Sequence, residues 1–386
     1  PRYPQYKDSG VDWLGQVPAH WEVKRVGYFF TERREKVSDR DFPPLSVTKN
    51  GIVPQLETAA KTDDNDNRKK VCRGDFVINS RSDRNGSSGA SDLDGSVSLI
   101  NTVLRPLDAV HTPFIHHLLR SHPFQQEYYR NGQGIVADLW TTNYSAMRDI
   151  RLGMPPLPEQ REIAGFLDRE TGKIDALVAE QERLLELLKE KRQAVISHAV
   201  TRGLNPNAPL KPSGLDWLGD VPAHWEVRKL SHLFRAGKGK NGQMLTKEFC
   251  GANPGEYPVY SGQTEDDGVM GTWDQYEFDF GEKGVLFSTT VGAKAMNLRQ
   301  LFGRFSLSQN CMVIWPSSAL CETRFFYYHF QPLFAFEREM IPDHMQASFR
   351  MEDLYGYRIA LPSLSEQRAI VAHLDAATAQ FDALTA

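Results

Sequence analysis

The chain contains one sequence frame twice. SGVDWLGQVPAHWEVKRV at residues 9–26 returns as SGLDWLGDVPAHWEVRKL at residues 213–230, with thirteen of eighteen positions identical. A second segment, MPPLPEQREIAGFLD at 154–168, returns as LPSLSEQRAIVAHLD at 361–375, whereas the sequences between these segments do not recur. A solenoid repeat is only about 20 to 50 residues long. The longer period therefore indicates a duplicated domain whose interior has diverged.

Size and composition agree with two globular domains. The 386 residues correspond to at least two domains at about 150 residues each, and 40% hydrophobic with 24% charged residues is typical of a globular protein. No apolar run approaches the roughly 18 residues of a membrane span, and no signal-peptide pattern begins the chain. We therefore expect a soluble, intracellular protein. The cysteines lack C-x-x-C spacing and are expected to be reduced and structural: Cys72, Cys250, Cys311 and Cys321.

A long helix is predicted over residues 154–202. Prolines at 155, 156 and 158 mark its start and Gly203 its end. Apolar residues alternate at spacings of four and three, which is the seam of a coiled coil, interrupted by Glu170, Gln181 and Lys191. At about 1.5 Å per residue, such a helix is about 60 Å long and could hold two domains apart. The seam residues are Ile163, Leu167, Ile174, Leu177, Leu184, Leu188 and Val195.

The second copy of this helix begins after Pro362. Its stripe contains Ile370, Leu374 and Phe381. The sequence stops at Ala386, so no counterpart of residues 180–200 is present, and position 1 is not Met. We expect from this that the natural chain is longer. The seam could instead pack on its own domain, but its length favours a partner helix.

The two interiors are predicted to be compact α/β domains. Short apolar runs at 75–79 and 284–291 read as strands, and residues 113–129 and 323–339 read as helices. The sequence lacks the phosphate-binding loop, the zinc-binding helix, the nucleophile elbow and the amino-methyltransferase motif. We therefore predict a non-catalytic chain with no metal or cofactor of its own.

Three interior segments are suited to nucleic acid. Residues 79–89 follow a strand and offer Asn and Arg side chains that can read adenine and guanine. Residues 228–247 carry six basic residues and no acidic one among glycines, and residues 288–297 again follow a strand. A solvated, turn-rich surface loop has the same composition, so that alternative stays open. The net charge of −4 means that any DNA contact must be local. The candidate DNA-binding residues are Asn79, Arg81, Arg84, Asn85, Lys238, Lys240, Thr289, Thr290 and Lys294.

The tryptophans fall into two groups. Those of the repeated frame are predicted to be packing anchors rather than base-stacking platforms, because they lie outside the variable interiors: Trp13, Trp21, Trp217 and Trp225. Trp140 and Trp273 belong to the interiors, and both roles stay open for them.

The frame SGVDWLGQVPAHWEV, the junction PPLPEQREIAGFLD and the long helix together resemble the specificity subunits of type I restriction-modification systems. The resemblance covers nearly the whole chain. It implies an α/β (α+β) fold class with two similar target-recognition domains, separated by long antiparallel coiled-coil helices in an internal pseudo-twofold repeat. The implied segments are the first arm and domain at 1–153, the spacer helix at 154–202, a linker and second arm at 203–227, the second domain at 228–360 and the start of the second helix at 361–386.

The resemblance also implies a mechanism. Each domain would read one half of an asymmetric bipartite site in double-stranded DNA, and the helices would set the gap and dock two methyltransferase (modification) subunits. S-adenosylmethionine would bind to those partners, and ATP and Mg to separate restriction and translocase subunits. Contact residues are not fixed in position across this family, so none is carried over. A stand-alone DNA-binding regulator and a protein scaffold are the alternatives.

Overall fold

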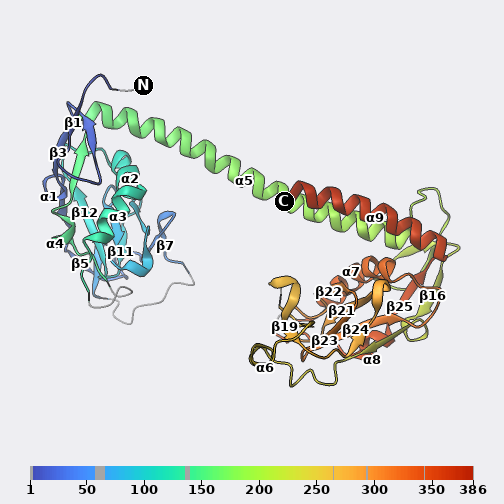
Figure 1. The fold of residues 1–386 in the computed structure, drawn as a ribbon. Coiled ribbons are helices and arrows are strands. Elements are labelled where there is room, and N and C mark those ends of the chain that lie inside the picture. The colour runs from blue at the N-terminus through green and yellow to red at the C-terminus, as the bar shows by residue number, and fades with distance from the viewer. Residues whose placement is uncertain are drawn as a thin grey trace. The chain divides into compact units, whose positions relative to one another are not determined.

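The structure is a computed structural model of the chain. It describes residues 3–56, 66–134, 140–263, 265–292, 294–342 and 344–385. The chain forms two compact units, Pro1–Ala179 and Glu180–Ala386, here called unit 1 and unit 2. The boundary falls inside the long helix α5 (Leu157–Arg202), so each unit includes part of that helix (Figure 1).

Unit 1 begins with the repeated frame. The strands β1 (Tyr6–Asp8) and β2 (Gln16–Pro18) form a hairpin, and β3 (Glu22–Arg25) pairs antiparallel with β13 (Arg151–Met154), which leads into α5. Hydrogen bonds from the arm converge on Glu159, in the first turn of α5. Tyr3 Oη lies 2.5 Å, His20 Nε2 2.7 Å and Trp21 Nε1 3.0 Å from its carboxylate oxygens. Burial opposes ionisation, but these bonds outweigh it and lower the pKa of Glu159.

The unit 1 interior is built on a four-stranded sheet of order β10–β9–β12–β4. The described residues of the interior also form a three-stranded sheet of order β11–β8–β5, the hairpin β6–β7 and four short α-helices. The sheet strands are β4 (Phe30–Glu32), β9 (Phe76–Asn79), β10 (Ser88–Ala90) and β12 (Asn101–Pro106). The other strands are β5 (Lys36–Val37), β6 (Leu45–Thr48), β7 (Gly51–Pro54), β8 (Arg68–Val71) and β11 (Gly95–Val97). The helices are α1 (Val26–Phe29), α2 (Thr112–Arg120), α3 (His122–Arg130) and α4 (Tyr144–Met147).

Unit 2 repeats this plan. Its hairpin is β14–β15, its frame strands β16 and β25 pair antiparallel, and its main sheet has the order β17–β24–β21–β22. A second sheet of order β19–β18–β23–β20 is added. The frame and main-sheet strands are β14 (Leu210–Pro212), β15 (Asp220–Pro222), β16 (Glu226–Lys229), β17 (Phe234–Gly237), β21 (Val285–Thr289), β22 (Leu298–Leu301), β24 (Cys311–Pro316) and β25 (Arg358–Leu361). The remaining elements are β18 (Tyr257–Tyr260), β19 (Val269–Trp273), β20 (Phe278–Asp279), β23 (Arg304–Leu307), α6 (Lys247–Ala252), α7 (Thr323–Glu339), α8 (Met351–Gly356) and α9 (Leu364–Thr385).

The two main sheets have the same order, although the interior sequences do not recur. Along the chain, β4, β9, β10 and β12 of unit 1 take the places of β17, β21, β22 and β24. The hairpin loops also match, because residues 80–87 and 290–297 each contain eight residues. The α/β fold class with two similar domains is therefore confirmed. Within the main sheets the divergence concerns side chains rather than strand order, whereas the additional sheets of the two units differ.

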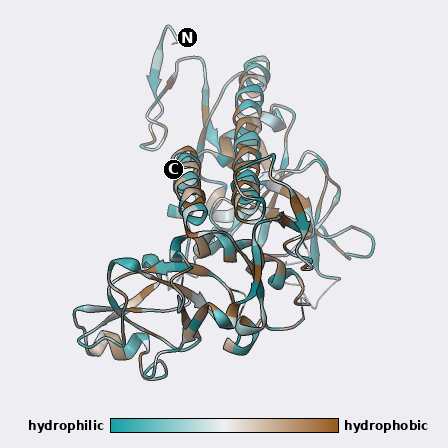
Figure 2. Ribbon diagram, turned by 90° about the vertical axis from the view of Figure 1, so that its right-hand side faces the viewer, coloured by the Kyte–Doolittle hydropathy of each residue, from teal (hydrophilic) through white to brown (hydrophobic). Residues whose placement is uncertain are grey.

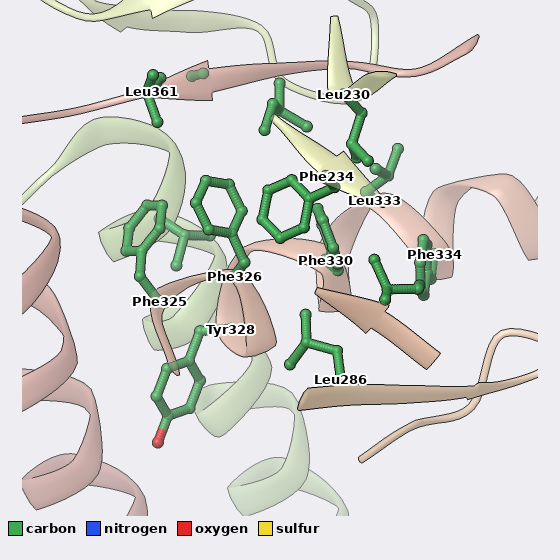
Figure 3. Close-up of a cluster of buried hydrophobic side chains, with 14 of the residues drawn as sticks. Leu230, Phe234, Leu286, Phe325, Phe326, Tyr328, Phe330, Leu333, Phe334 and Leu361 are labelled. Carbon is green, nitrogen blue, oxygen red and sulfur yellow. The ribbon is translucent and has the colours of Figure 1, made fainter. Parts of the chain in front are cut away.

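Aromatic packing dominates the core of unit 2. Phe234 from β17 packs against two rings of α7, at centroid distances of 4.7 Å to Phe326 and 5.5 Å to Phe330 (Figure 3). Trp225 is fully buried in the same cluster, with Trp217 packed against it, and Trp13 packs against the unit 1 core. The interpretation of the frame tryptophans as packing anchors is confirmed for these three. Trp21 instead donates a hydrogen bond from its indole N–H to Glu159. Of the interior pair, Trp273 is buried and Trp140 is exposed.

The predicted helix at 113–129 is two helices. The chain leaves the helical conformation at Ser121 (ψ 144°), which precedes Pro123 in the first turn of α3. Proline suits the start of a helix but disrupts a helix interior, which explains the break. The predicted helix at 323–339 is α7.

The long helices carry hydrophobic and hydrophilic residues interleaved along their length (Figure 2). In unit 2, α9 runs beside the C-terminal part of α5 in the opposite direction (Figure 1). Ile370 and Leu374 are fully buried in one cluster with Ile196 and Val200, and Arg192 Nε lies 3.7 Å from Asp382 Oδ1. The antiparallel pairing predicted for the two helices is present over this stretch.

The predicted seam is only partly covered. Ile163 packs on the unit 1 core and Val195 on the unit 2 core, while Leu167, Leu188 and Phe381 are half-buried. Between them Ile174, Leu177 and Leu184 are 59%, 66% and 54% exposed.

None of the described helices combines the length and the hydropathy that a membrane-spanning helix requires.

One buried glutamine makes the same three hydrogen bonds in each copy. Gln160 Oε1 accepts from His111 N at 2.8 Å, and its Nε2 donates to Ala109 O and Pro155 O. Gln367 Oε1 accepts from Glu322 N at 2.8 Å, and its Nε2 donates to Leu320 O and Pro362 O. Both glutamines come from the repeated Glu-Gln-Arg motif. They tie the start of each long helix to the loop that precedes α2 or α7.

We predict that Gln367→Ala destabilises unit 2 by about 3 kcal/mol, because it leaves buried backbone groups without partners. Hydrogen exchange of peptides covering 318–326 and urea unfolding would measure this loss. The control Gln181→Ala alters an exposed position of α5 and should change stability by less than about 0.5 kcal/mol. Equal losses of stability in the two variants would contradict a stabilising role for the Gln367 hydrogen bonds.

Candidate nucleic-acid interface

Strand direction brings the predicted loops together within each unit. In unit 2, β17 and β21 both pair antiparallel with β24. They therefore run parallel to each other, and the loops that follow them leave the same edge of the sheet. In unit 1, β4 and β9 have the same relation to β12. The segments after β4 and after β9 consequently share an edge as well.

A later segment closes this edge in both units. The backbone N–H of Thr142 donates to Ser80 O at 2.9 Å, and that of Phe349 donates to Thr290 O at 2.7 Å. Isolated antiparallel bridges join Arg81 to Thr141 and Val291 to Ser348. Thr142 and Phe349 lie 207 positions apart, which is the offset of the second repeated segment. The closure is thus a shared feature of the scaffold.

Each edge contains a cavity beside the short helix that follows, α4 or α8. The unit 1 cavity has a volume of about 400 Å³ and is lined by Glu32, Arg34, Lys36, Lys69, Leu99, Asn143, Tyr144 and Ser145. The unit 2 cavity, about 350 Å³, is lined by Lys238, Thr290, Val291, Ser348, Phe349, Arg350, Met351 and Glu352. Asn143 and Arg350, the N-cap residues of α4 and α8, are again 207 positions apart. The two cavities therefore lie at equivalent places beside these helices, although Thr290 and Val291 line the unit 2 cavity and no described residue of 79–89 lines the unit 1 cavity.

The unit 1 cavity is basic. Glu32 is its one acidic lining residue, and its carboxylate contacts Arg34 Nε at 2.6 Å and Lys69 Nζ at 3.3 Å. Lys36 adds a third cation. Beside the cavity the half-buried Arg33 forms a bidentate pair with the buried Asp75, at 2.7 and 3.1 Å, and this hydrogen bonding raises the pKa of Arg33. The pair fixes the backbone from which Arg34 projects.

The candidate residues of 79–89 differ in accessibility. Asn79 is 8% exposed, and its Oδ1 accepts from the N–H of Arg81 at 3.1 Å. The Arg81 guanidinium is paired with both oxygens of Asp83, at 3.0 and 3.1 Å. Arg84, with 68% of its side chain exposed, and the exposed Asn85 are the groups most available to a ligand.

The basic run at 228–247 is not one loop, which corrects that expectation. Arg228 and Lys229 lie in β16, Arg235 in β17 and Lys247 in α6. Leu230, Leu233 and Phe234 are buried and draw this part of the run into the core. Lys238 and Lys240 do lie on the loop after β17 and are exposed. Lys238 also lines the unit 2 cavity.

The threonines after β21 lie beneath the surface. Thr289 is 3% exposed, donates from its hydroxyl to Lys294 O and accepts from Asn297 N at 3.1 Å. Thr290 is 1% exposed, and its hydroxyl has no hydrogen-bond partner among the described residues. Their geometry supports a role in shaping the loop that carries Lys294. DNA contact by the nine candidate residues stays a prediction.

Several lining residues were missed by sequence reasoning. Arg34 and Lys36 follow the first interior strand, as Lys238 does in unit 2, and Asn143 and Arg350 precede equivalent short helices. The signal that could have found them is their position relative to the repeated segments: each lies within 11 residues of one of these segments, on the side of the variable interior. The described residues contain no group of three or more His, Cys, Asp or Glu that could hold a metal ion.

Comparison with known proteins identifies the family. The family model of the type I restriction modification DNA specificity domain matches residues 222–386. The MjaVIII type I restriction enzyme specificity subunit of Methanocaldococcus jannaschii is 22% identical over 241 residues, which are 61% of this chain and 53% of that protein. A putative type I specificity subunit of Mycoplasma pneumoniae is 29% identical over 46% of this chain and 62% of its own length. The putative MjaX specificity subunit of the first organism is 20% identical over 94% of this chain and 88% of its own length.

Solved structures agree on the fold. A chain from a study of complex assembly and conformational transition of the type I R-M system has a TM-score of 0.70 at 18% identity, covering 95% of this chain and 92% of that one. The HsdS subunit from Thermoanaerobacter tengcongensis has a TM-score of 0.50 at 19% identity, covering 95% and 91%. Both likenesses show that this chain has the two-domain fold of these proteins. Residues 222–386 belong to the type I restriction modification DNA specificity domain family, and the chain as a whole is similar to specificity subunits of type I restriction-modification systems.

The adjacent threonines provide a matched test of the loop. We predict that Thr289→Val costs about 1 to 3 kcal/mol, because two hydrogen bonds of the loop are lost, and that Thr290→Val costs less than about 0.5 kcal/mol. Urea unfolding and hydrogen exchange at residues 294–298 would measure both. A large loss of stability for Thr290→Val would contradict the description of its hydroxyl as unbonded.

Proposed function

We propose that this chain is the non-catalytic DNA-specificity subunit of a type I restriction-modification complex. Each unit reads one half of an asymmetric bipartite site. The observation that supports this most directly is the pair of equivalent cavities, each bounded by loops that differ between the copies and held by a scaffold that does not. One scaffold with two different sets of exposed side chains is what reading two different sequences requires.

Reading combines two kinds of contact. Exposed arginine and asparagine on the loop at 80–87 offer bidentate hydrogen bonds to guanine and adenine, each worth roughly 1 to 3 kcal/mol of discrimination. The lysines at 238 and 240, together with Arg34 and Lys36, supply charge for phosphates, which adds salt-sensitive affinity without sequence preference. Local basic loops allow this within a chain of net charge −4.

The exposed face of α5 is proposed to dock two methyltransferase (modification) subunits. Large apolar side chains that remain at least 40% exposed along the helix mark an interaction surface: Phe166, Ile174, Leu177, Val178, Leu184, Leu185 and Leu187. In this proposal S-adenosylmethionine binds to the modification subunits, and ATP and Mg bind to restriction and translocase subunits. This chain directs their chemistry to the DNA target.

A residue-level test uses the chain assembled with its modification subunit. After the bound sequence has been selected from random duplexes, we predict that Arg84→Ala weakens binding roughly 5- to 150-fold, corresponding to about 1 to 3 kcal/mol, and relaxes preference in one half of the site only. Lys7→Ala, an exposed position of the arm, serves as the control and should leave the preference unchanged.

Three outcomes would count against this function. Relaxed preference in both halves would remove the assignment of unit 1 to one half-site. Selection of the same specific site by the chain alone, with equal affinity, would favour a stand-alone regulator. An assembled complex that selects no sequence would favour a scaffold.

A further inference from the structure

The repeated frame places like charges directly opposite each other in both units. The frame ribbons are the two-stranded pairs β3–β13 and β16–β25. In the register of the first, Arg25 faces Arg151, and in the second Lys229 faces Arg358. All four residues are exposed. Like charges opposite each other on an antiparallel pair are destabilising. These facing cations therefore lower the stability of each ribbon, and selection for stability does not explain their presence.

The two copies keep the charge at these positions but exchange the residue. Lys24-Arg25 of the first frame becomes Arg228-Lys229 in the second, whereas Arg151 and Arg358 are the same residue. These ribbon positions are thus positively charged in both copies, whereas the interior sequences differ between the copies. A contact that needs only charge tolerates this exchange, as phosphate contacts do. Bidentate pairing with a protein carboxylate does not, because the planar guanidinium and the ammonium ion differ in geometry.

In unit 1 the ribbon forms one wall of a cavity of about 490 Å³. Its lining contains four cations and one acidic residue, Asp149, which pairs with Arg25 at 3.0 Å. Neither Arg148 nor Arg151 forms an ion pair with any described residue. Tyr28, 57% exposed, lies at the same cavity with Lys24 Nζ 3.9 Å from its ring centroid. The cavity is therefore a positively charged surface with unpaired guanidinium groups.

This surface adjoins the candidate interface within the unit. We call the cavities beside α4 and α8 the recognition cavities, and the cavity beside the unit 1 ribbon the frame cavity. Asn143, the N-cap of α4, lines the unit 1 recognition cavity, while Arg148, the C-cap of the same helix, lines the frame cavity. In unit 2, α8 takes the same place, with Arg350 at its N-cap and Arg358 two residues after its last residue. The phosphate backbone of a duplex flanks the base edges across a major groove about 12 Å wide, so cations beside the recognition cavity can meet it.

We propose that the two frame ribbons are phosphate-binding surfaces that hold the DNA backbone independently of sequence, one beside each recognition cavity. This inference rests on the proposed function. It separates two tasks in the duplication: the variable loops choose the sequence, and the repeated ribbons supply affinity and register common to all targets. The cross-strand repulsion in each ribbon is relieved when an anion binds between the facing cations.

The test measures how affinity depends on salt. The assembled complex is prepared with Arg25→Gln/Arg151→Gln or with Lys229→Gln/Arg358→Gln, and binding to cognate and unrelated duplexes is titrated over a range of NaCl concentrations. Each double variant should reduce the slope of log K against log salt by about two, close to one per lost phosphate contact. Affinity should fall by the same factor on both duplexes, with the selected sequence unchanged. The exchanges Arg25→Lys and Lys229→Arg should retain the wild-type slope.

Folding and assembly are controlled separately. Removing the like-charge opposition offsets the loss of the exposed Arg25–Asp149 pair, so the thermal midpoint of each variant should not fall. Co-elution with the modification subunit should be unaffected. An unchanged salt slope would overturn the proposal. Loss of the modification subunit with an unchanged slope would reassign the ribbons to protein docking, and an altered target sequence would reassign them to recognition. Wild-type complex without any sequence preference would refute the proposed function, while the slope on unrelated DNA would still test the ribbons.

Discussion

The antiparallel pairing of one central strand with both its neighbours places the candidate loops of each unit at one edge of its main sheet. In unit 2 that strand is β24, and in unit 1 it is β12. Because both neighbours run against it, two loops far apart in the sequence leave the sheet at one edge. A third segment, hydrogen-bonded to the base of one loop, closes the edge. The position of the site is thus a property of backbone pairing, and the side chains on the loops are free to differ.

The repeated residues perform the tasks that the pairing cannot. Gln160 and Gln367 join each long helix to its domain through the same three hydrogen bonds. The frame tryptophans at 13, 217 and 225 pack against the cores. These contacts explain why the frame recurs at high identity, whereas the main-sheet strands of the interiors, three to six residues long, differ in sequence between the copies. Duplication of such a unit supplies two independently variable surfaces on one chain.

Much of this organisation could be predicted from the sequence, and the omissions have physical causes. The repeat, the long helix and strands β9 and β21 follow from identity and hydrophobic periodicity. The common sheet order could not be predicted, because strand pairing depends on backbone contacts that leave little trace in short, unlike strands. Burial of Thr289 and Thr290 was missed since polar residues at the end of a buried strand resemble a loop. Exposure of Leu177 and Leu184 was missed since a heptad pattern indicates a partner without locating it.

The central claim is that each unit specifies its own half of one DNA site. The most direct measurement is methylome sequencing of cells that carry this chain and its modification subunit, compared with cells in which residues 80–87 or residues 290–297 are replaced by an unrelated loop of equal length. The account predicts a bipartite methyladenine motif in which each replacement alters or abolishes recognition of a different half. A motif that changes in both halves with either replacement, or in neither, in complexes that assemble normally, would contradict it.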